Sequence, residues 1–230
     1  MKKALLCILF LATACGAPPA DTPTPALTVV KVYATAAAQV WQTQLFKCAA
    51  KQSVTLMLTE PGSADILLRI GEPDNLSMRA LPAFQLGWEQ IVVVVNNARS
   101  STQLRTEQSA ELFTGQISDW GQIANPQNGG TEGGAVQVWV FAQGDDVQQV
   151  FAKTLTGKPI ISSARLAASP DEMSQAIAND PNAVGILSRH WKTENVSDGY
   201  VAASTPVLAI TPSEPQGVVK NLLVCLQGSE

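Results

Sequence analysis

The chain has 230 residues, of which 46% are hydrophobic and 15% are charged, and its formal net charge is −4. This composition supplies enough apolar side chains for a folded core and excludes a chain that is disordered throughout. The acidic balance without a basic cluster argues against a nucleic-acid-binding protein, and no apolar run after residue 14 reaches the ~18 residues of a membrane-spanning helix.

Residues 1–14 have the pattern of a signal peptide. Lys2 and Lys3 precede an apolar stretch that is too short to span a membrane. The small residues that follow lead to Cys15, in a pattern that resembles the lipobox of bacterial lipoproteins, although Ala12 stands where that motif usually has leucine. The resemblance implies that Cys15 is lipidated and begins the mature protein. An ordinary secretory signal with an incidental cysteine is the alternative.

Residues 15–26 follow as a proline-rich segment. Four prolines between positions 18 and 25 disfavour a helix or a central strand and predict an extended tether. We therefore expect an extracytoplasmic domain that is anchored to the outer face of the cell membrane through its lipid.

The rest of the chain alternates predicted strands and helices. We expect strands at residues 28–33, 54–58, 64–70, 91–95, 136–141, 183–187 and 207–210, and helices at 36–51, 107–113, 145–155 and 170–179 and from about 215 onward. Residues 91–95 are apolar on both faces, which predicts a central strand. The alternation favours an α/β domain with a mainly parallel sheet.

Two of the four cysteines remain for the folded domain, because Cys7 leaves with the signal peptide and Cys15 takes the lipid. Cys48 and Cys225 each lie on the apolar stripe of a predicted helix. Outside the cytoplasm they are plausible disulfide partners, and closing so long a loop would contribute about 4–5 kcal/mol. Two buried free thiols are the alternative, and the sequence leaves both open.

Residues 111–120, Glu-Leu-Phe-Thr-Gly-Gln-Ile-Ser-Asp-Trp, form the most specific stretch of the chain. They resemble the "IFxGxIxxW" signature of the phosphate-type periplasmic substrate-binding proteins of ABC transporters. Gly115 permits the left-handed cap that ends a helix at this point. Segments 64–66, 87–96 and 180–187 also resemble that family, in its order, and the resemblance covers about residues 27–226.

The resemblance implies a two-lobed α/β fold, the periplasmic-binding-protein-like type II fold, in which two crossing segments join the lobes around a cleft. The domain would span residues 27–230, with lobe 1 formed by 27–92 and 188–230 and lobe 2 by 93–187. Segments 87–96 and 180–187 would be the crossings, and Cys48 and Cys225 would share lobe 1. It also implies hinge closure on a small solute, with an oxyanion as one candidate, an ABC permease as partner, and a monomer.

Phosphate binders of this family hold their oxyanion with backbone N–H groups, hydroxyls and an arginine. Their "RxxGSGT" segment here reads Phe141-Ala142-Gln143-Gly144-Asp145-Asp146-Val147, which keeps the glycine but replaces the arginine, serine and threonine. Carboxylates at this position oppose an anion, so inorganic phosphate is disfavoured. The alternative is that Asp145 only caps its helix in a protein without a tight ligand.

The candidate ligand-binding residues combine hydroxyls, charged groups and the retained glycine. They are Thr35, Asp65, Arg69, Thr114, Gly144 and Asp145. Arg69 could equally be a solvated surface residue, and Thr114 could be no more than the end of a helix.

We expect neither catalysis nor a cofactor. The only histidine, His190, has no neighbouring cluster of cysteines or carboxylates that would make a metal site, and it is expected at the surface near the lobe boundary. The sequence has no Gly-x-Ser-x-Gly elbow and no Walker loop. A transport receptor, a non-transport sensor or scaffold lipoprotein and, less favoured, a hydrolase are the functions that remain.

Overall fold

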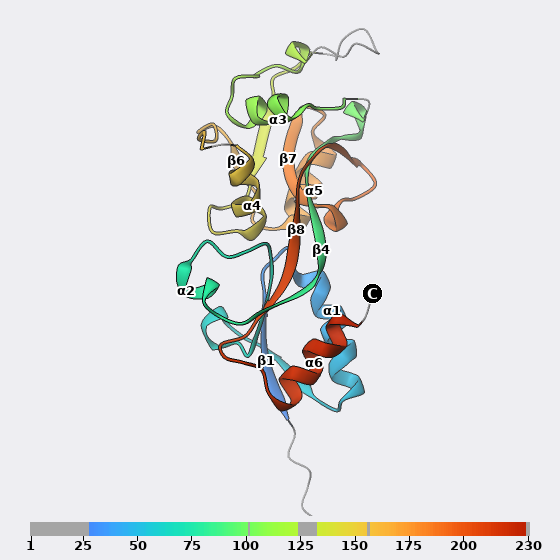
Figure 1. The fold of residues 1–230 in the computed structure, drawn as a ribbon. Coiled ribbons are helices and arrows are strands. Elements are labelled where there is room, and N and C mark those ends of the chain that lie inside the picture. The colour runs from blue at the N-terminus through green and yellow to red at the C-terminus, as the bar shows by residue number, and fades with distance from the viewer. Residues whose placement is uncertain (1–27, 101, 124–132, 156, 229–230) are drawn as a thin grey trace, which may run out of the picture.

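The computed structural model describes residues 28–100, 102–123, 133–155 and 157–228 (Figure 1). The expected signal peptide, Cys15 and the tether lie outside these residues. Within the part of the chain that is described, no helix is both long and apolar enough to cross a membrane.

In the residues that the structure describes, the strands form a single sheet of eight, in the order β2-β1-β3-β8-β4-β7-β5-β6. The strands are β1 (Val29–Ala34), β2 (Thr55–Leu58), β3 (Ile66–Ile70), β4 (Ala83–Asn96), β5 (Gln137–Val140), β6 (Arg165–Leu166), β7 (Ala183–Ser188) and β8 (Val196–Ile210). Neighbouring strands are parallel at both ends of the sheet, whereas β4 and β8 make the antiparallel pairings at its centre. The predicted α/β class is confirmed.

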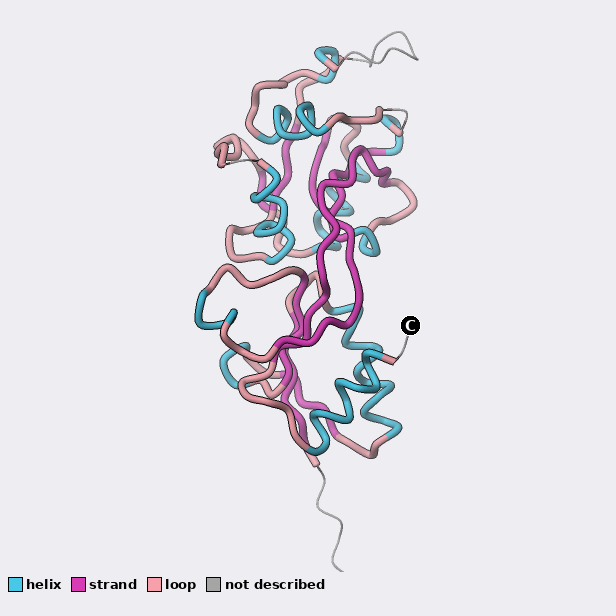
Figure 2. The backbone as a smooth tube through the Cα atoms, viewed as in Figure 1, coloured by secondary structure: helices cyan, strands magenta, loops and turns pink. Residues whose placement is uncertain are grey.

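Two long strands connect two halves of the molecule. β4 and β8 pair with each other along their whole lengths, from Ala83 opposite Ile210 to Asn96 opposite Val196. Figures 1 and 2 show both strands running from a lower half, which holds β1 to β3, into an upper half, which holds β5 to β7. Each half therefore has its own strands and helices, and the pair β4–β8 is their shared spine.

The second connection differs from the predicted one. Segment 180–187 was expected to return to the first half, but β7 pairs with β4 from Ile91 opposite Ser188 to Val95 opposite Val184 and then ends in the upper half. The return is made by β8. Partly buried polar and small residues interrupt the apolar pattern over most of this strand, so only its apolar end at 207–210 had the pattern of a strand. The prediction took β7 for the crossing because its residues are apolar enough to be buried along the whole strand, as those of a crossing strand are.

The helices cover the sheet in both halves: α1 (Gln39–Lys51), α2 (Leu76–Arg79) and α6 (Gly217–Gln227) in the lower half, and α3 (Thr106–Phe113), α4 (Asp146–Thr154) and α5 (Pro170–Asn179) in the upper half (Figure 1). A disulfide joins Cys48 on α1 to Cys225 on α6, with 5.9 Å between their Cα atoms.

The signature segment 111–120 forms the corner that its spacing predicts. Gly115 has a φ of 76°, which confirms the left-handed turn after α3, and the side chain of Ile161 lies where a Cβ would project. Trp120 is fully buried, and its indole N–H donates to the carbonyl of Asn182 at 2.9 Å. This corner therefore joins α3 to the turn that leads into β7.

Removing the Cys48–Cys225 disulfide should destabilise the protein. A double substitution to alanine is expected to lower the free energy of unfolding by about 2–5 kcal/mol, because the bond restrains a long loop in the unfolded chain. The two cysteines are 177 positions apart. Urea denaturation with and without a reductant measures the effect. The reductant should destabilise the native sequence and leave the variant unchanged, and equal stability of the oxidised and reduced protein would contradict the expectation.

Candidate functional site

The candidate site lies where the beginning of α4 meets the ends of β1 and β3. These two parallel strands end beside each other in the lower half, since Ala34 pairs with Leu68. Thr35 follows β1, and Ile70 is the last residue of β3. α4 belongs to the upper half and starts at Asp146, so the site is formed by both halves (Figure 1).

Asp145 caps α4. It has an extended backbone, and its Oδ1 accepts hydrogen bonds from the N–H groups of Val147 at 2.9 Å and Gln148 at 3.2 Å. This is the geometry of an N-cap, which satisfies N–H groups that have no partner inside the helix. The interpretation of Asp145 as an N-cap is confirmed.

Asp146 reaches across to the other half. Its Oδ2 accepts a hydrogen bond from the Thr35 hydroxyl and another from the Ile70 N–H at 2.7 Å, while its Oδ1 accepts from the Val147 N–H at 3.0 Å. The residue is only 2% exposed. A buried carboxylate is costly unless donors satisfy it, and here two of the three donors come from the lower half.

Arg69 brings a positive charge to the same place. The residue is buried, and its guanidinium donates to the carbonyl of Gly71 at 2.9 Å and to the side chain of Gln149 at 3.0 Å. Burial lowers the pKa of Arg69, whereas the negative charges of Asp146, Asp74 and Asp145 act to raise it. Arg69 therefore links β3 to α4 and partly balances the two carboxylates.

Burial raises the pKa of Asp145 to about 6, and the negative charge of Asp146 adds to the rise. The hydrogen bonds from Gln148 and Val147 and the charge of Arg69 oppose it. A carboxylate with this pKa changes its charge just below neutral pH, so the electrostatics of the site depend on pH in that range.

Four of the six predicted site residues come together here. Thr35, Arg69 and Asp145 contribute as described, and the carbonyl of Gly144 accepts a hydrogen bond from the Gln149 side chain at 3.3 Å. Gly144 has open space where a Cβ would lie.

The other two lie elsewhere. Asp65 precedes β3 and accepts a hydrogen bond from the Lys31 N–H at 2.8 Å, so it is at the beginning of the strand whose other end forms the site. Thr114 follows α3, and its hydroxyl donates to the carbonyl of Ala110 at 2.9 Å within the same helix. Neither residue belongs to this site. The family resemblance placed both residues along the chain, but it did not show where they lie relative to the ends of β1 and β3.

Two contributors were missed. Asp146 appeared in the sequence analysis only as one of the carboxylates that oppose an anion. The signal for a separate role was in the sequence, since one carboxylate is enough to cap a helix. The Ile70 N–H has no signal in the sequence, because every residue except proline carries this donor.

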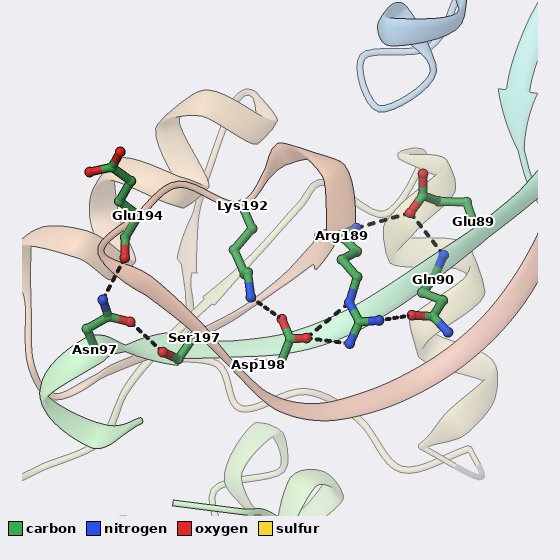
Figure 3. A network of polar contacts seen from close by, with 8 residues as sticks. All are labelled: Glu89, Gln90, Asn97, Arg189, Lys192, Glu194, Ser197 and Asp198. Carbon is green, nitrogen blue, oxygen red and sulfur yellow. Dashed lines mark hydrogen bonds and ion pairs between the residues drawn. The ribbon is translucent and has the colours of Figure 1, made fainter. Parts of the chain in front are cut away.

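A second set of polar contacts holds the segment after β7 to the connecting strands (Figure 3). Asp198 on β8 accepts from Lys192 at 2.8 Å and from the Arg189 Nε at 3.0 Å, and Arg189 also contacts Gln90 on β4. Burial acts to raise the pKa of Asp198, but the hydrogen bonds from Lys192 and Arg189 outweigh it and hold that pKa below its usual value. These contacts therefore join the segment that follows β7 to both connecting strands, β4 and β8.

His190 lies in this region as an exposed residue. Its Nδ1 contacts the carboxylate of Glu89 on β4. The neighbouring Trp191 donates from its indole N–H to the carbonyl of Ala37 at 3.0 Å, which is a further contact between the halves. Among the residues that the structure describes, no group of three or more His, Cys, Asp or Glu side chains is arranged to hold a metal ion.

A groove of about 690 Å³ runs along α4 and the segment 158–166. Its lining includes Phe141, Gln149 and Lys153. Gln149 also receives the hydrogen bond from Arg69, so the groove adjoins the candidate site.

Comparison with solved structures places this arrangement among known folds. A protein described as a phosphate ABC transporter substrate-binding protein, from Clostridium perfringens and with bound phosphate, matches with a TM-score of 0.75 at 14% identity, over 88% of this chain and 94% of its own. An ABC-type phosphate transport receptor from Vibrio cholerae matches with a TM-score of 0.65 at 18% identity, over the same shares. The chain has the fold of these binding proteins.

The same fold serves other functions. The regulatory domain of OxyR2 from Vibrio vulnificus, in its reduced form, matches with a TM-score of 0.60 at 12% identity, over 87% of this chain and 95% of its own. No family model matches the sequence, and no curated protein does. At these identities the likeness establishes the two-lobed binding-protein fold, while the ligand has to be argued from the site.

The raised pKa of Asp145 predicts a pH-dependent stability. The folded protein binds this proton more tightly than the unfolded chain, so the stabilisation is present below about pH 4 and is lost as the pH rises through about 6. Asp145→Asn keeps a capping oxygen and removes the charge. The melting temperature of the variant should therefore exceed that of the native protein by a few degrees at pH 7.5, and the difference should shrink as the pH falls toward 4.

The matched control is Asp171→Asn, in the first turn of α5 and exposed to solvent. It removes one negative charge from an exposed position and so reports the effect of net charge alone. A constant difference for Asp145→Asn would contradict the expectation.

Proposed function

We propose that the protein is an extracytoplasmic solute-binding lipoprotein that holds a small solute between its two halves, as the phosphate-binding component of an ABC transporter does. The observation that carries this proposal is the convergence of polar groups from β1, β3 and α4 between halves that only two long strands connect. Ligand sites are commonly formed at such junctions, where closure about the connecting strands can enclose the solute.

Inorganic phosphate is an unsuitable solute for this site at neutral pH. Two unit charges of the same sign that lie 4 Å apart repel by about 4 kcal/mol at an effective dielectric constant of ~20. Asp146 already presents a carboxylate to the donors that an anion would need. A neutral or cationic solute that donates hydrogen bonds to the carboxylates would fit the charge of the site better.

The membrane and transport parts of the proposal rest on the sequence and on the named neighbours. The lipobox-like segment supports a lipid at Cys15, and the tether would hold the domain away from the membrane. The neighbours named as parts of ABC phosphate transport support a permease as partner. We propose a monomer with no cofactor and no enzymatic activity.

A non-transport sensor or scaffold is the second candidate. The observation that favours it is that the Thr35 hydroxyl and the Ile70 N–H are already bonded to Asp146. A hydrolase has less support. The Ser188 hydroxyl and the Glu89 carboxylate both contact the same nitrogen, Nδ1, of His190, and Ser188 is buried, whereas a catalytic histidine uses one ring nitrogen for each partner.

A thermal-shift screen tests the proposed solute class. At pH 7.5 we expect millimolar phosphate or sulfate to leave the melting temperature unchanged, and a sugar, an amino acid or an amine to raise it. A solute at 100 times its Kd should add about 2.7 kcal/mol to the unfolding free energy. Thr35→Val should weaken that shift, whereas Thr114→Val, outside the site, should preserve it. A large shift with micromolar phosphate would contradict the proposed class, and the absence of any shift would favour the sensor or scaffold.

A further inference from the structure

The buried carboxylate of Asp146 does more than cap a helix. Asp145 already accepts from the first free N–H groups of α4, at 2.9 and 3.2 Å. One oxygen of Asp146 instead accepts two hydrogen bonds from the opposite half, one from the Thr35 hydroxyl and one from the Ile70 N–H. Capping therefore does not explain why a second carboxylate is buried at this point.

The groups around Asp146 are those that bind an oxyanion. They comprise one hydroxyl, the N–H groups of Ile70 and Val147, and the beginning of a nine-residue helix. Arg69 supplies a nearby positive charge and is held in place by Gln149. Uncharged donors and a helix N-terminus, with a cation beside them, stabilise a dehydrated anion. The anion that these groups hold in this structure is the side chain of Asp146.

We propose that Asp146 is an internal ligand, whose carboxylate occupies an oxyanion site between the halves, holds the cleft closed without a solute and excludes inorganic oxyanions. The inference rests on the proposed function in taking this cleft as the ligand site. It adds that one side chain, Asp146, excludes oxyanions, and that the groups around this side chain are sufficient to bind an oxyanion once it is removed.

The same contacts connect the two halves. The bonds from Thr35 and Ile70 to Asp146 join the ends of β1 and β3 to α4, and Trp191 bonds to Ala37 nearby. Each bond is made only when the halves are close together. A solute that enters the cleft therefore has to break these bonds to Asp146, and its apparent affinity is reduced in proportion to the fraction of molecules that Asp146 keeps closed.

Removing the carboxylate should create an oxyanion site. Asp146→Ser leaves space and an uncharged hydroxyl, and isothermal titration of the protein with sulfate and with phosphate at pH 7.5 should show affinity at least about a hundredfold higher than in the native protein. Asp171→Ser is the matched control, because it removes the same charge from the first turn of another helix, α5, where the side chain is exposed and outside the site. It should change oxyanion affinity by less than about threefold.

A double variant and the control distinguish the loss of the carboxylate at this position from the loss of one negative charge. Thr35→Val combined with Asp146→Ser should lose most of the gained affinity, because it removes a donor to the bound oxyanion. Equal gains in the Asp171 and Asp146 variants would show that net charge alone excludes the anion, and would overturn the proposal. No gain in a folded Asp146→Ser variant would also overturn it.

Thr35→Val by itself keeps the proposal testable if Asp146→Ser does not fold, since Thr35 is partly exposed and Asp146 stays in place. Small-angle scattering should show a larger radius of gyration for this variant than for the solute-free native protein. An equal radius would overturn the closing role of Asp146. If Asp146→Ser gains oxyanion affinity and no compound in the screen binds the native protein, the role of Asp146 as an internal ligand is supported and the proposed solute-binding function is rejected.

Discussion

The antiparallel pairing of β4 with β8 is the constraint on which the rest of the structure depends. Both strands are longer than any other in the sheet, and they pair from Ala83 opposite Ile210 to Asn96 opposite Val196. β3 adds to one end of this pair and β7 to the other, so each half grows from its own end of the spine. A two-stranded connection can act as a hinge, so closure of the halves on a solute would take place beside it.

The chemistry of the cleft follows from that geometry. Parallel strands β1 and β3 end together in the lower half, and the helix dipole of α4 points its positive end at them from the upper half. Such a junction favours a negative charge, and the chain supplies one from Asp146. On our proposal, the fold of phosphate-binding proteins is combined with a site that Asp146 already fills, so the chain would share their architecture and disfavour their ligand.

Local patterns predicted the fold better than the site. The apolar run 91–95 predicted a central strand, and Gly115 predicted the corner after α3, because burial on both faces and a left-handed turn leave clear signatures. Only the end of β8 at 207–210 was predicted, because polar, small and partly exposed residues break the apolar pattern over the rest of the strand. At the site, the N-cap at Asp145 followed from its position, whereas the contact of Asp146 with Ile70 joins residues 76 positions apart and depends on how the halves meet.

Hydrogen exchange of single amides tests the account most directly. The N–H of Ile70 donates to Asp146, while the N–H of the next residue, Gly71, donates to the carbonyl of Pro206 at 2.7 Å, so the two neighbours report on the cleft and on the sheet separately. We predict that both amides are protected in the solute-free protein, and that Asp146→Ser abolishes the protection at Ile70 and preserves it at Gly71. Rapid exchange at Ile70 in the native protein, or unchanged protection in the variant, would contradict a cleft that its own carboxylate holds closed.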